Sequence, residues 1–254
     1  MASADRFLLA TMTSPQVQAE IAAGRTTIVV PFGAVEQHGP HLPLDTDTVL
    51  ADRLGPLIAE RLDGLCAPTI PIGCSKHHLA LAGTLSLQPE TLQRVVRDLV
   101  ESLAAHGFHR IILLPTHGGN EEPLRQAAAE SRRDGITLVV AGLGAIVAAL
   151  LADASARGVT PGDQGGHAGE LETSLMLALA PHVVRTSLME AGYLGPLDDG
   201  ATRVFFDQGA AALSPNGVIG DPRGSSSAAG HAYVAAFLDE VEAQLREIDH
   251  HDKP

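Results

Sequence analysis

Short apolar runs alternate with longer helical repeats over the first half of the chain. Runs of β-branched and aliphatic residues that end at proline or glycine are typical of buried strands. Such runs cover residues 26–33, 65–73, 109–120 and 136–144, and two prolines weaken the second. Apolar residues at helical spacing lie between these runs, over residues 47–62, 88–107 and 121–135. The alternation predicts an α/β protein with parallel strands and helices on both faces of the sheet.

The strongest helical pattern lies over residues 88–107. Gly107 ends it, and its apolar face is formed by Leu92, Val95, Val96, Leu99 and Leu103. Further along, one helix is predicted to begin near Ala168, and another to close the chain over residues 225–248. Residues 194–227 are rich in Gly, Ser and Asp and are predicted to be loops. No linker or repeat interrupts the chain, so we predict one domain over residues 1–254.

Composition limits the partners that the chain can have. It is 45% hydrophobic but only 3% aromatic, so aliphatic residues must fill the core, as in a sheet covered by helices. A formal net charge of −13 argues against a nucleic-acid partner and against an anionic membrane, since both would repel the chain. No signal peptide and no apolar run of membrane-spanning length is recognised, so we expect a cytoplasmic location.

Metal-binding side chains follow three of the predicted strands. Glu36 and His38 follow the first strand, His117 follows the third, and the second is followed by Ser75, His77 and His78. Because the carboxyl ends of parallel strands meet at one edge of a sheet, we expect these side chains to converge. Each residue alone could cap a helix or fix a turn. Their joint position at strand ends favours a metal site.

The stretch PFGAVEQHGPHLPLDTDT carries the densest group of these residues. Glu36 and His38 are two apart, so they point the same way if the chain is extended. Pro40 and Pro43 stiffen the loop, and Asp47 stands where the next helix begins. Mixed carboxylate and imidazole ligands suit zinc, manganese or iron. A carboxylate between two elements can bridge two ions, which together activate water and polarise a carbonyl.

A second group lies in GDQGGHAGELETSLM. Glu172 falls in the first turns of the helix predicted to begin near Ala168, where the helix dipole favours a carboxylate. His167 stands just before this helix. Since the pKa of histidine lies near neutrality, His167 is a candidate for proton transfer beside the predicted site.

Together these stretches resemble a known family. VPFGAVEQHGPHLPLDTDT, AGTLSL, THGGN and GGHAGELETSLM are similar to the signature blocks of the creatininase family of metal-dependent amidohydrolases, and GVIGDPRGSSSAAG resembles its closing block. The resemblance implies a three-layer α/β/α sandwich with a mostly parallel sheet, two divalent transition metals per chain and hydrolysis of an amide-like C–N bond in a small substrate. It also implies a homohexamer.

Site residues follow from the resemblance position by position. Glu36, His38 and Asp47 fall on metal ligands, with Asp47 as the bridging carboxylate, and His117 falls on the ligand histidine. His167 falls on the histidine assigned as proton relay. We expect the residues around these ligands to bind substrate, namely Ser75, His78, Gly118 and Asn120.

The chain departs from the family's namesake in two ways. Creatininase has a glutamate two residues after the ligand histidine, where this chain has Gly119, so the missing ligand is Glu172 or, as a weaker candidate, Glu122. Creatininase encloses its flat substrate with tryptophans, and this chain has none, so creatinine is not the expected substrate. Relatives that share HGGN include a deformylase of ring-opened purines and the peptidase that trims the mycofactocin precursor. The family also contains hydrolases of oxidised cyclitols.

Three rival interpretations are weaker. Gly142 and Gly144 follow a strand as in a dinucleotide-binding loop, but Val147 replaces the third glycine. No G-x-S-x-G motif supports a serine hydrolase. A non-catalytic metal-binding subunit would keep the ligands but close the coordination shell, as structural sites do.

Overall fold

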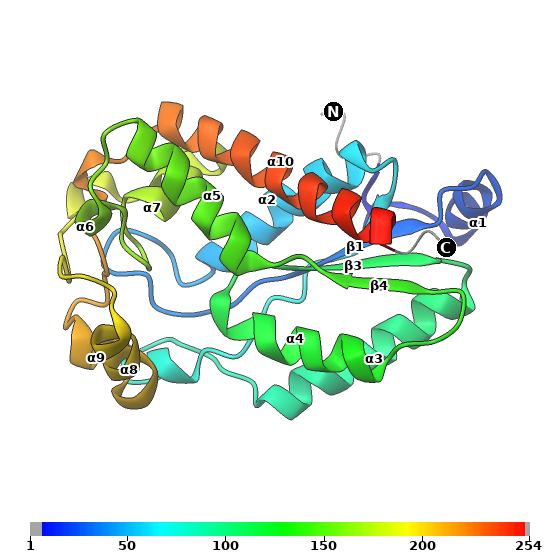
Figure 1. The fold of residues 1–254 in the computed structure, drawn as a ribbon, viewed down its shortest axis with the longest axis horizontal. Helices are drawn as coiled ribbons and strands as arrows, with labels where there is room; N and C mark the ends of the chain where they lie inside the picture. Colours follow the sequence, from blue (N-terminus) through cyan, green and yellow to red (C-terminus); the bar gives the residue numbers. More distant parts are fainter. Residues whose placement is uncertain (1–6, 252–254) are drawn as a thin grey trace.

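A computed structural model describes residues 7–251 (Figure 1). At its centre lies a sheet of four parallel strands in the order β2-β1-β3-β4. The strands are β1 (Thr27–Phe32), β2 (Leu65–Cys66), β3 (Arg110–Pro115) and β4 (Thr137–Val140). The predicted parallel sheet is therefore confirmed.

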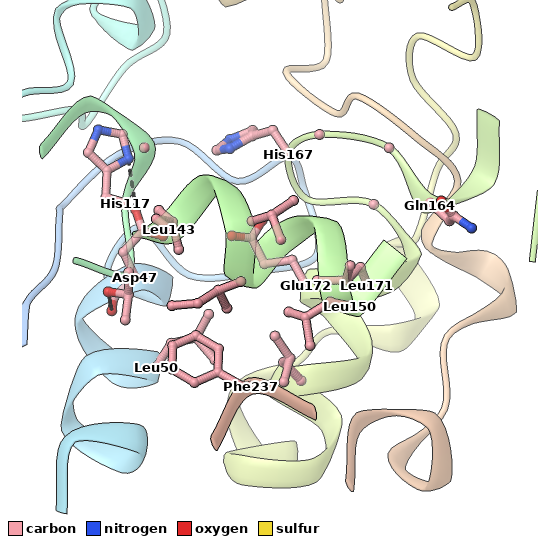
Figure 2. Close-up of a pocket in the computed structure, with 18 of the residues that line it drawn as sticks. Asp47, Leu50, His117, Leu143, Leu150, Gln164, His167, Leu171, Glu172 and Phe237 are labelled. Atoms are coloured by element: carbon pink, nitrogen blue, oxygen red, sulfur yellow. Dashed lines mark hydrogen bonds and ion pairs between the residues drawn. The ribbon is translucent and has the colours of Figure 1, made fainter. Parts of the chain in front are cut away.

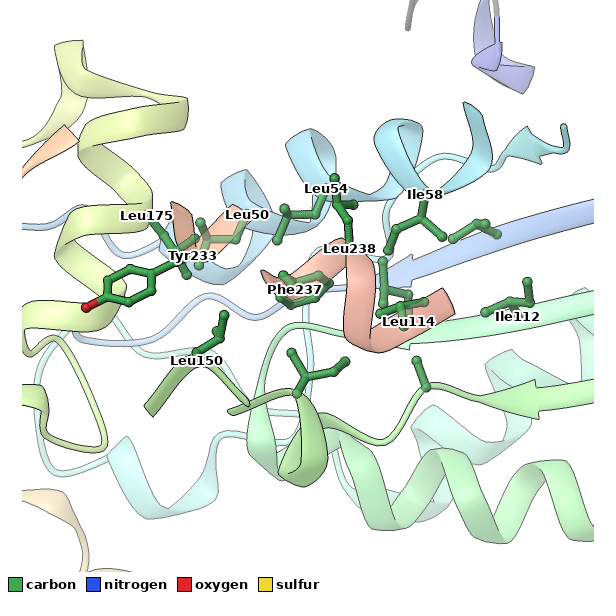
Figure 3. Close-up of a cluster of buried hydrophobic side chains, with 14 of the residues drawn as sticks. Leu50, Leu54, Ile58, Ile112, Leu114, Leu150, Leu175, Tyr233, Phe237 and Leu238 are labelled. Atoms are coloured by element: carbon green, nitrogen blue, oxygen red, sulfur yellow. The ribbon is translucent and has the colours of Figure 1, made fainter. Parts of the chain in front are cut away.

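Helices cover both faces of this sheet and confirm the three-layer α/β/α architecture. One face carries α2 (Thr46–Arg61), α5 (Leu143–Ala156) and α10 (Ser227–His251), and the other carries α3 (Pro89–Ala105) and α4 (Gly118–Glu130) (Figure 1). Side chains alternate along each strand, so Ile112 and Leu114 pack toward the first layer, whereas Ile111 and Leu113 pack toward the second. Figure 3 shows the hydrophobic packing of the first layer, with Leu54 of α2 and Phe237 of α10.

The shorter elements lie at the two ends of the sheet. Helix α1 (Ser14–Ala22) is at the end where the strands begin, and four helices lie beyond the strands' carboxyl ends: α6 (Pro161–Gln164), α7 (Glu170–Leu179), α8 (Asp199–Gln208) and α9 (Ala210–Leu213) (Figure 1). Single 3₁₀ turns are formed by Leu9–Thr11, Lys76–His78, Pro181–Val183, Thr186–Leu188 and Pro222–Gly224. Within residues 7–251, no helix combines the length and apolar character needed to cross a membrane.

Several predicted elements need correction. The strand predicted over residues 65–73 shrinks to the two residues of β2, because Pro68 and Pro71 supply no N–H for a ladder. Helix α4 begins at Gly118 and not at residue 121. Residues 194–227 contain α8 and α9, although their composition predicted loops. Helix α5 was not predicted, because its sequence LGAIVAALLADASA is apolar on most sides and lacks a helical alternation.

Strand order places a topological switch at the carboxyl end of β1. The chain leaves β1 toward β2 on one side and later returns to β3 on the other. The loops after β1 and β3 therefore diverge and leave a crevice, which is where open α/β sheets bind ligands.

A buried carboxylate links α7 to α10 beside this crevice. Glu170 is 2% exposed. Its Oε2 accepts a hydrogen bond from the Tyr233 hydroxyl at 2.7 Å, and its Oε1 accepts one from the Ser174 hydroxyl at 2.8 Å. Because both of its oxygens accept hydrogen bonds, Glu170 fixes the first turn of α7 against α10.

Tyr233→Phe is expected to lower the free energy of unfolding by about 1–3 kcal/mol, since it leaves one oxygen of a buried carboxylate without a donor. Tyr193→Phe is the matched control, because the Tyr193 hydroxyl donates to the Pro196 carbonyl in an exposed loop. The control should change stability by no more than about 0.5 kcal/mol. Urea unfolding of both variants measures this. Equal losses of unfolding free energy in the two variants would contradict the role of Glu170.

Candidate metal centre

Five polar residues converge at the switch point between β1 and β3. Glu36 and His38 lie on the loop after β1, and His117 stands two residues after β3 as the N-cap of α4. Asp47 lies in the first turn of α2, and Glu172 lies in the first turn of α7. The structure thus brings together all five residues that the sequence predicted as metal ligands.

Asp47 stands between two groups of ligand atoms. Its Oδ1 is 3.7 Å from His38 Nε2, which is itself 3.6 Å from Glu172 Oε1. Its Oδ2 is 3.5 Å from His117 Nδ1. Ligand atoms at about 2.1 Å from a tetrahedral ion lie roughly 3.4 Å apart, so these separations suit coordination.

The second group is completed by Glu36. Its Oε1 is 3.3 Å from His117 Nδ1, and a ligand atom of Glu36 also lies within 4.8 Å of one of His38. His77 also offers a ring nitrogen within 4.8 Å of ligand atoms of Glu36 and His117. Asp47 Oδ1 therefore faces His38, which lies beside Glu172, and Asp47 Oδ2 faces His117, which lies beside Glu36.

Buried atoms without partners show that these residues fit cations. Glu36 Oε2, His38 Nε2 and Asp47 Oδ2 are buried and have no hydrogen-bond partner. Among the residues that the structure describes, no lysine or arginine forms an ion pair with Glu36, Asp47 or Glu172. Buried carboxylates without a positive partner are costly, and divalent ions would supply the missing charge.

Hydrogen bonds orient the two ligand histidines. His38 Nδ1 lies 3.0 Å from the backbone carbonyl of Glu36, and His117 Nε2 lies 3.2 Å from the carbonyl of Cys74. Each ring donates from that nitrogen, because a carbonyl only accepts. In the neutral ring, the other nitrogen then presents its lone pair toward Asp47, which is the arrangement that metal-ligating histidines require.

The same contacts shift the pKa values of these groups. Burial opposes a charge on His117, but the carboxylates of Glu36 and Asp47 outweigh it and raise the pKa of His117 to about 9. Burial raises the pKa of Asp47 to about 6, against the opposing effect of His38. Burial opposes a charge on Glu172, but His38, with smaller contributions from His167 and the Ala168 N–H, outweighs it and lowers the pKa of that carboxyl to about 2. The carboxylates thus favour the charged form of His117, and His38 favours the charged form of Glu172.

Of the two candidates for the last ligand, only one lies beside the cluster. Glu122 is exposed on α4 and accepts a hydrogen bond from Gln126 at 2.7 Å, away from the cluster. Glu172 Oε2 instead accepts the N–H of Ala168 at 2.7 Å. Ala168 has φ of +52°, a left-handed conformation that a non-glycine residue adopts only when its surroundings enforce it. The strained turn thus helps to place Glu172 near His38.

His167 lies over the cluster in a fixed orientation. Its Nε2 is 2.6 Å from the Gln37 carbonyl, to which it donates, and its Nδ1 is 3.7 Å from Glu36 Oε1. Gln37 was missed by sequence reasoning, although it stands between two predicted ligands. Its amide Nε2 lies 2.8 Å from His78 Nδ1 and 3.1 Å from the Gly217 carbonyl, so it holds the loop after β1 against two distant segments.

The residues predicted to bind substrate occupy different places. Gly118 lines the cavity beside the ligands. Ser75, His78 and Asn120 are buried around the ligands and are engaged with protein groups. His78 Nε2 lies 3.4 Å from Glu36 Oε1, and Ser75 Oγ lies 3.4 Å from His117 Nε2. The Asn120 amide bonds the backbone of Cys74 and Gly33 at 2.9 Å each, so it ties two loops together.

The cavity beside these ligands has a volume of about 190 Å³. Figure 2 shows Asp47, His117, His167 and Glu172 with the aliphatic side chains of neighbouring helices. The centre is therefore accessible to a small molecule.

Comparison with known proteins agrees with this geometry. The sequence model of the creatininase family, described as creatinine amidohydrolase, matches residues 10–245. The chain belongs to the creatininase family of hydrolases. The mycofactocin precursor peptide peptidase of Mycobacterium ulcerans (strain Agy99) is 36% identical over 228 residues, which cover 86% of this chain and 84% of the relative. The creatinine amidohydrolase of Pseudomonas putida is 33% identical over 187 residues, covering 68% and 72% of the two chains.

Solved creatininases share the fold. A structure described as creatininase Mn superposes with a TM-score of 0.81 and 25% identity, covering 95% of this chain and 98% of the other. A mutant creatininase described as Zn-Zn type superposes equally well, with a TM-score of 0.81 and 25% identity, covering 95% and 97% of the two chains. The resemblance noted in the sequence is confirmed.

Gly119 marks where this creatininase-family chain differs from the namesake. A Cβ at Gly119 would lie 2.2 Å from the Cys74 carbonyl oxygen and 2.5 Å from His117 Nε2. No side chain fits there unless the Cys74 loop moves, and that loop supplies the acceptor that orients His117. The chain therefore has no room for a glutamate at this position, which accords with the placement of Glu172.

Gly119→Ala is expected to weaken zinc binding about 10- to 100-fold, because it displaces the carbonyl that orients His117. Gly118→Ala is the matched control, since a Cβ at Gly118 meets nothing within 4 Å. Zinc affinity is measured for both by competition with a chelator. If the two variants bind zinc equally well, the Cys74 carbonyl does not support the centre.

Proposed function

We propose that the chain is a two-metal hydrolase that cleaves an amide-like C–N bond. The observation that carries the proposal is the position of Asp47, whose two oxygens face separate sets of ligands. Glu36 and His117 would hold one ion, His38 and Glu172 the other, and Asp47 would bind both. When bound, such a pair supplies the Lewis acidity that activates water and polarises a carbonyl.

The kinds of ion follow from the ligands and the relatives. Nitrogen and carboxylate donors suit zinc, manganese and iron. Solved relatives are described as Mn and Zn-Zn types. We therefore propose zinc or manganese, with iron as a further candidate.

His167 is proposed to move the proton. The Gln37 carbonyl holds its Nε2–H, so Nδ1 keeps a lone pair on the side of Glu36. Burial lowers the pKa of His167, with a further contribution from His38, and a neutral ring can accept a proton. It would take a proton from the attacking water and give it to the leaving nitrogen.

An open-chain amide, such as a peptide bond, is the favoured substrate. The apolar side chains of the cavity wall are aliphatic except for Phe237, and the chain has no tryptophan to enclose a flat ring such as creatinine. The similarity to the peptide peptidase also extends over more of the chain than that to the creatinine amidohydrolase. A screen of peptides, cyclic amides and oxidised cyclitols with the zinc- and manganese-loaded protein tests the choice. Hydrolysis of the cyclitols alone would overturn it. The homohexamer and the cytoplasmic location stay predictions.

Asp47→Ala is expected to lose both ions, because its removal takes a ligand from each group. His38→Ala should lose one ion preferentially, since His38 faces only one side of Asp47. Elemental analysis of the purified variants measures the ions per chain. Loss of a single ion in Asp47→Ala would show that Asp47 does not bridge.

His167→Ala is expected to keep its metal and fold but to lose roughly 100- to 10,000-fold in turnover of the best substrate from the screen. His231→Ala is the control, because His231 is exposed on α10. Turnover, metal content and unfolding are measured for both variants. A His167→Ala protein depleted of metal would instead make His167 a ligand, and near-normal turnover would leave it a structural role only.

A further inference from the structure

The cavity beside the metal centre has an exposed mouth and an apolar floor. Gly118, Val147 and Gly166 line it and are exposed, with Val147 at 37%. Its floor is formed by buried side chains of α2, α5 and α10, at most 4% exposed, including Leu50, Leu54, Ile146, Leu150 and Phe237. A molecule that enters at the mouth therefore reaches the ligand atoms and the apolar floor together.

Helical spacing joins the ligands to this floor. Leu50 and Leu54 follow Asp47 by three and seven residues on α2, so they extend the same face of the helix. Leu175 follows Glu172 by three residues on α7 in the same way. Figure 2 shows Leu50, Leu150 and Phe237 grouped on one side of Asp47 and Glu172. The helices that carry two of the ligands thus also supply apolar walls.

Polar side chains that line the cavity, apart from the ligands and His167, already form hydrogen bonds within the protein. The Gln164 amide donates to the Ser155 hydroxyl at 2.9 Å and to the Val159 carbonyl at 3.0 Å. The Thr116 hydroxyl donates to the Asp47 carbonyl at 2.7 Å. A polar substituent that reached the floor would lose its hydrogen bonds to water without replacement, which is unfavourable.

We propose that this cavity binds a branched aliphatic or aromatic group next to the scissile bond, so that the substrates are amides that carry such a group. The inference rests on the proposed metal-dependent hydrolase and names its substrate class. The volume of about 190 Å³ is sufficient, since an apolar cavity of roughly 150 Å³ takes up benzene. Substrates with a small or charged group at this place would be poor, because one methylene in an apolar pocket changes selection roughly 10- to 200-fold.

The test uses hydroxamates, which combine a chelating head with a chosen tail. Zinc-loaded protein is titrated by calorimetry with acetohydroxamate, 4-methylpentanohydroxamate and succinic monohydroxamate. The branched tail should bind at least about tenfold more tightly than the acetyl compound, and the acidic tail should give no gain. Equal affinity for all three would overturn the apolar cavity as a binding site and leave the metal centre standing.

A variant at the mouth tests the location. Val147→Phe should place a ring in the cavity and cancel the advantage of the branched tail, with acetohydroxamate binding unchanged. Val95→Phe makes the same change on α3, on the opposite face of the sheet, and should keep the advantage. If Val147→Phe also keeps it, the tail binds elsewhere and the proposal is wrong.

A second binding experiment tests the cavity without a bound metal ion. A protein that takes up no zinc and binds no acetohydroxamate would refute the hydrolase centre. Binding of 4-methylpentanamide and acetamide, which lack a chelating head, is then compared by NMR titration. A preference of about tenfold for the branched amide, lost in Val147→Phe, supports the cavity independently, and its absence overturns the inference.

Discussion

The buried carboxylate of Asp47 is the constraint around which the centre is organised. It is 2% exposed, and its two oxygens face different imidazoles, at 3.7 Å for His38 and 3.5 Å for His117. With Glu36 and Glu172 nearby, the site gathers three carboxylates without a lysine or arginine partner in the described part of the chain. Such a concentration of charge is stable only with cations or protons present. Ion binding would therefore also stabilise the arrangement of the ligand residues.

Backbone groups around the centre fix the orientation of the ligand side chains through hydrogen bonds. Carbonyl groups of Glu36 and Cys74 orient His38 and His117, and the N–H of Ala168 holds Glu172. Close approach of the Cys74 loop is possible only because residue 119 is glycine. The left-handed Ala168 and the crowded Gly119 are local costs that the fold accepts in order to present the ligands, as is common at functional sites.

The cavity connects this centre to the hydrophobic core. Leu54, Leu150 and Phe237 belong to the packed layer between α2, α5, α10 and the sheet and also form the cavity floor (Figure 3). The same side chains therefore stabilise the fold and shape the proposed binding cavity. A change in the floor alters both the packing of the layer and the space offered to a substrate.

The sequence by itself determined the parallel sheet, most of the long helices and the candidate ligand residues. Apolar runs such as TTIVVPF can be buried only between two helical layers, and strand ends must meet at one edge. Tertiary structure alone decided that Glu172 and not Glu122 joins His38, that Asn120 binds backbone, and that α5 and α8 are helices. These outcomes depend on contacts between segments far apart in the chain, such as His38 with Glu172, Asn120 with the backbone of Gly33, and α5 against α10, which no local spacing encodes.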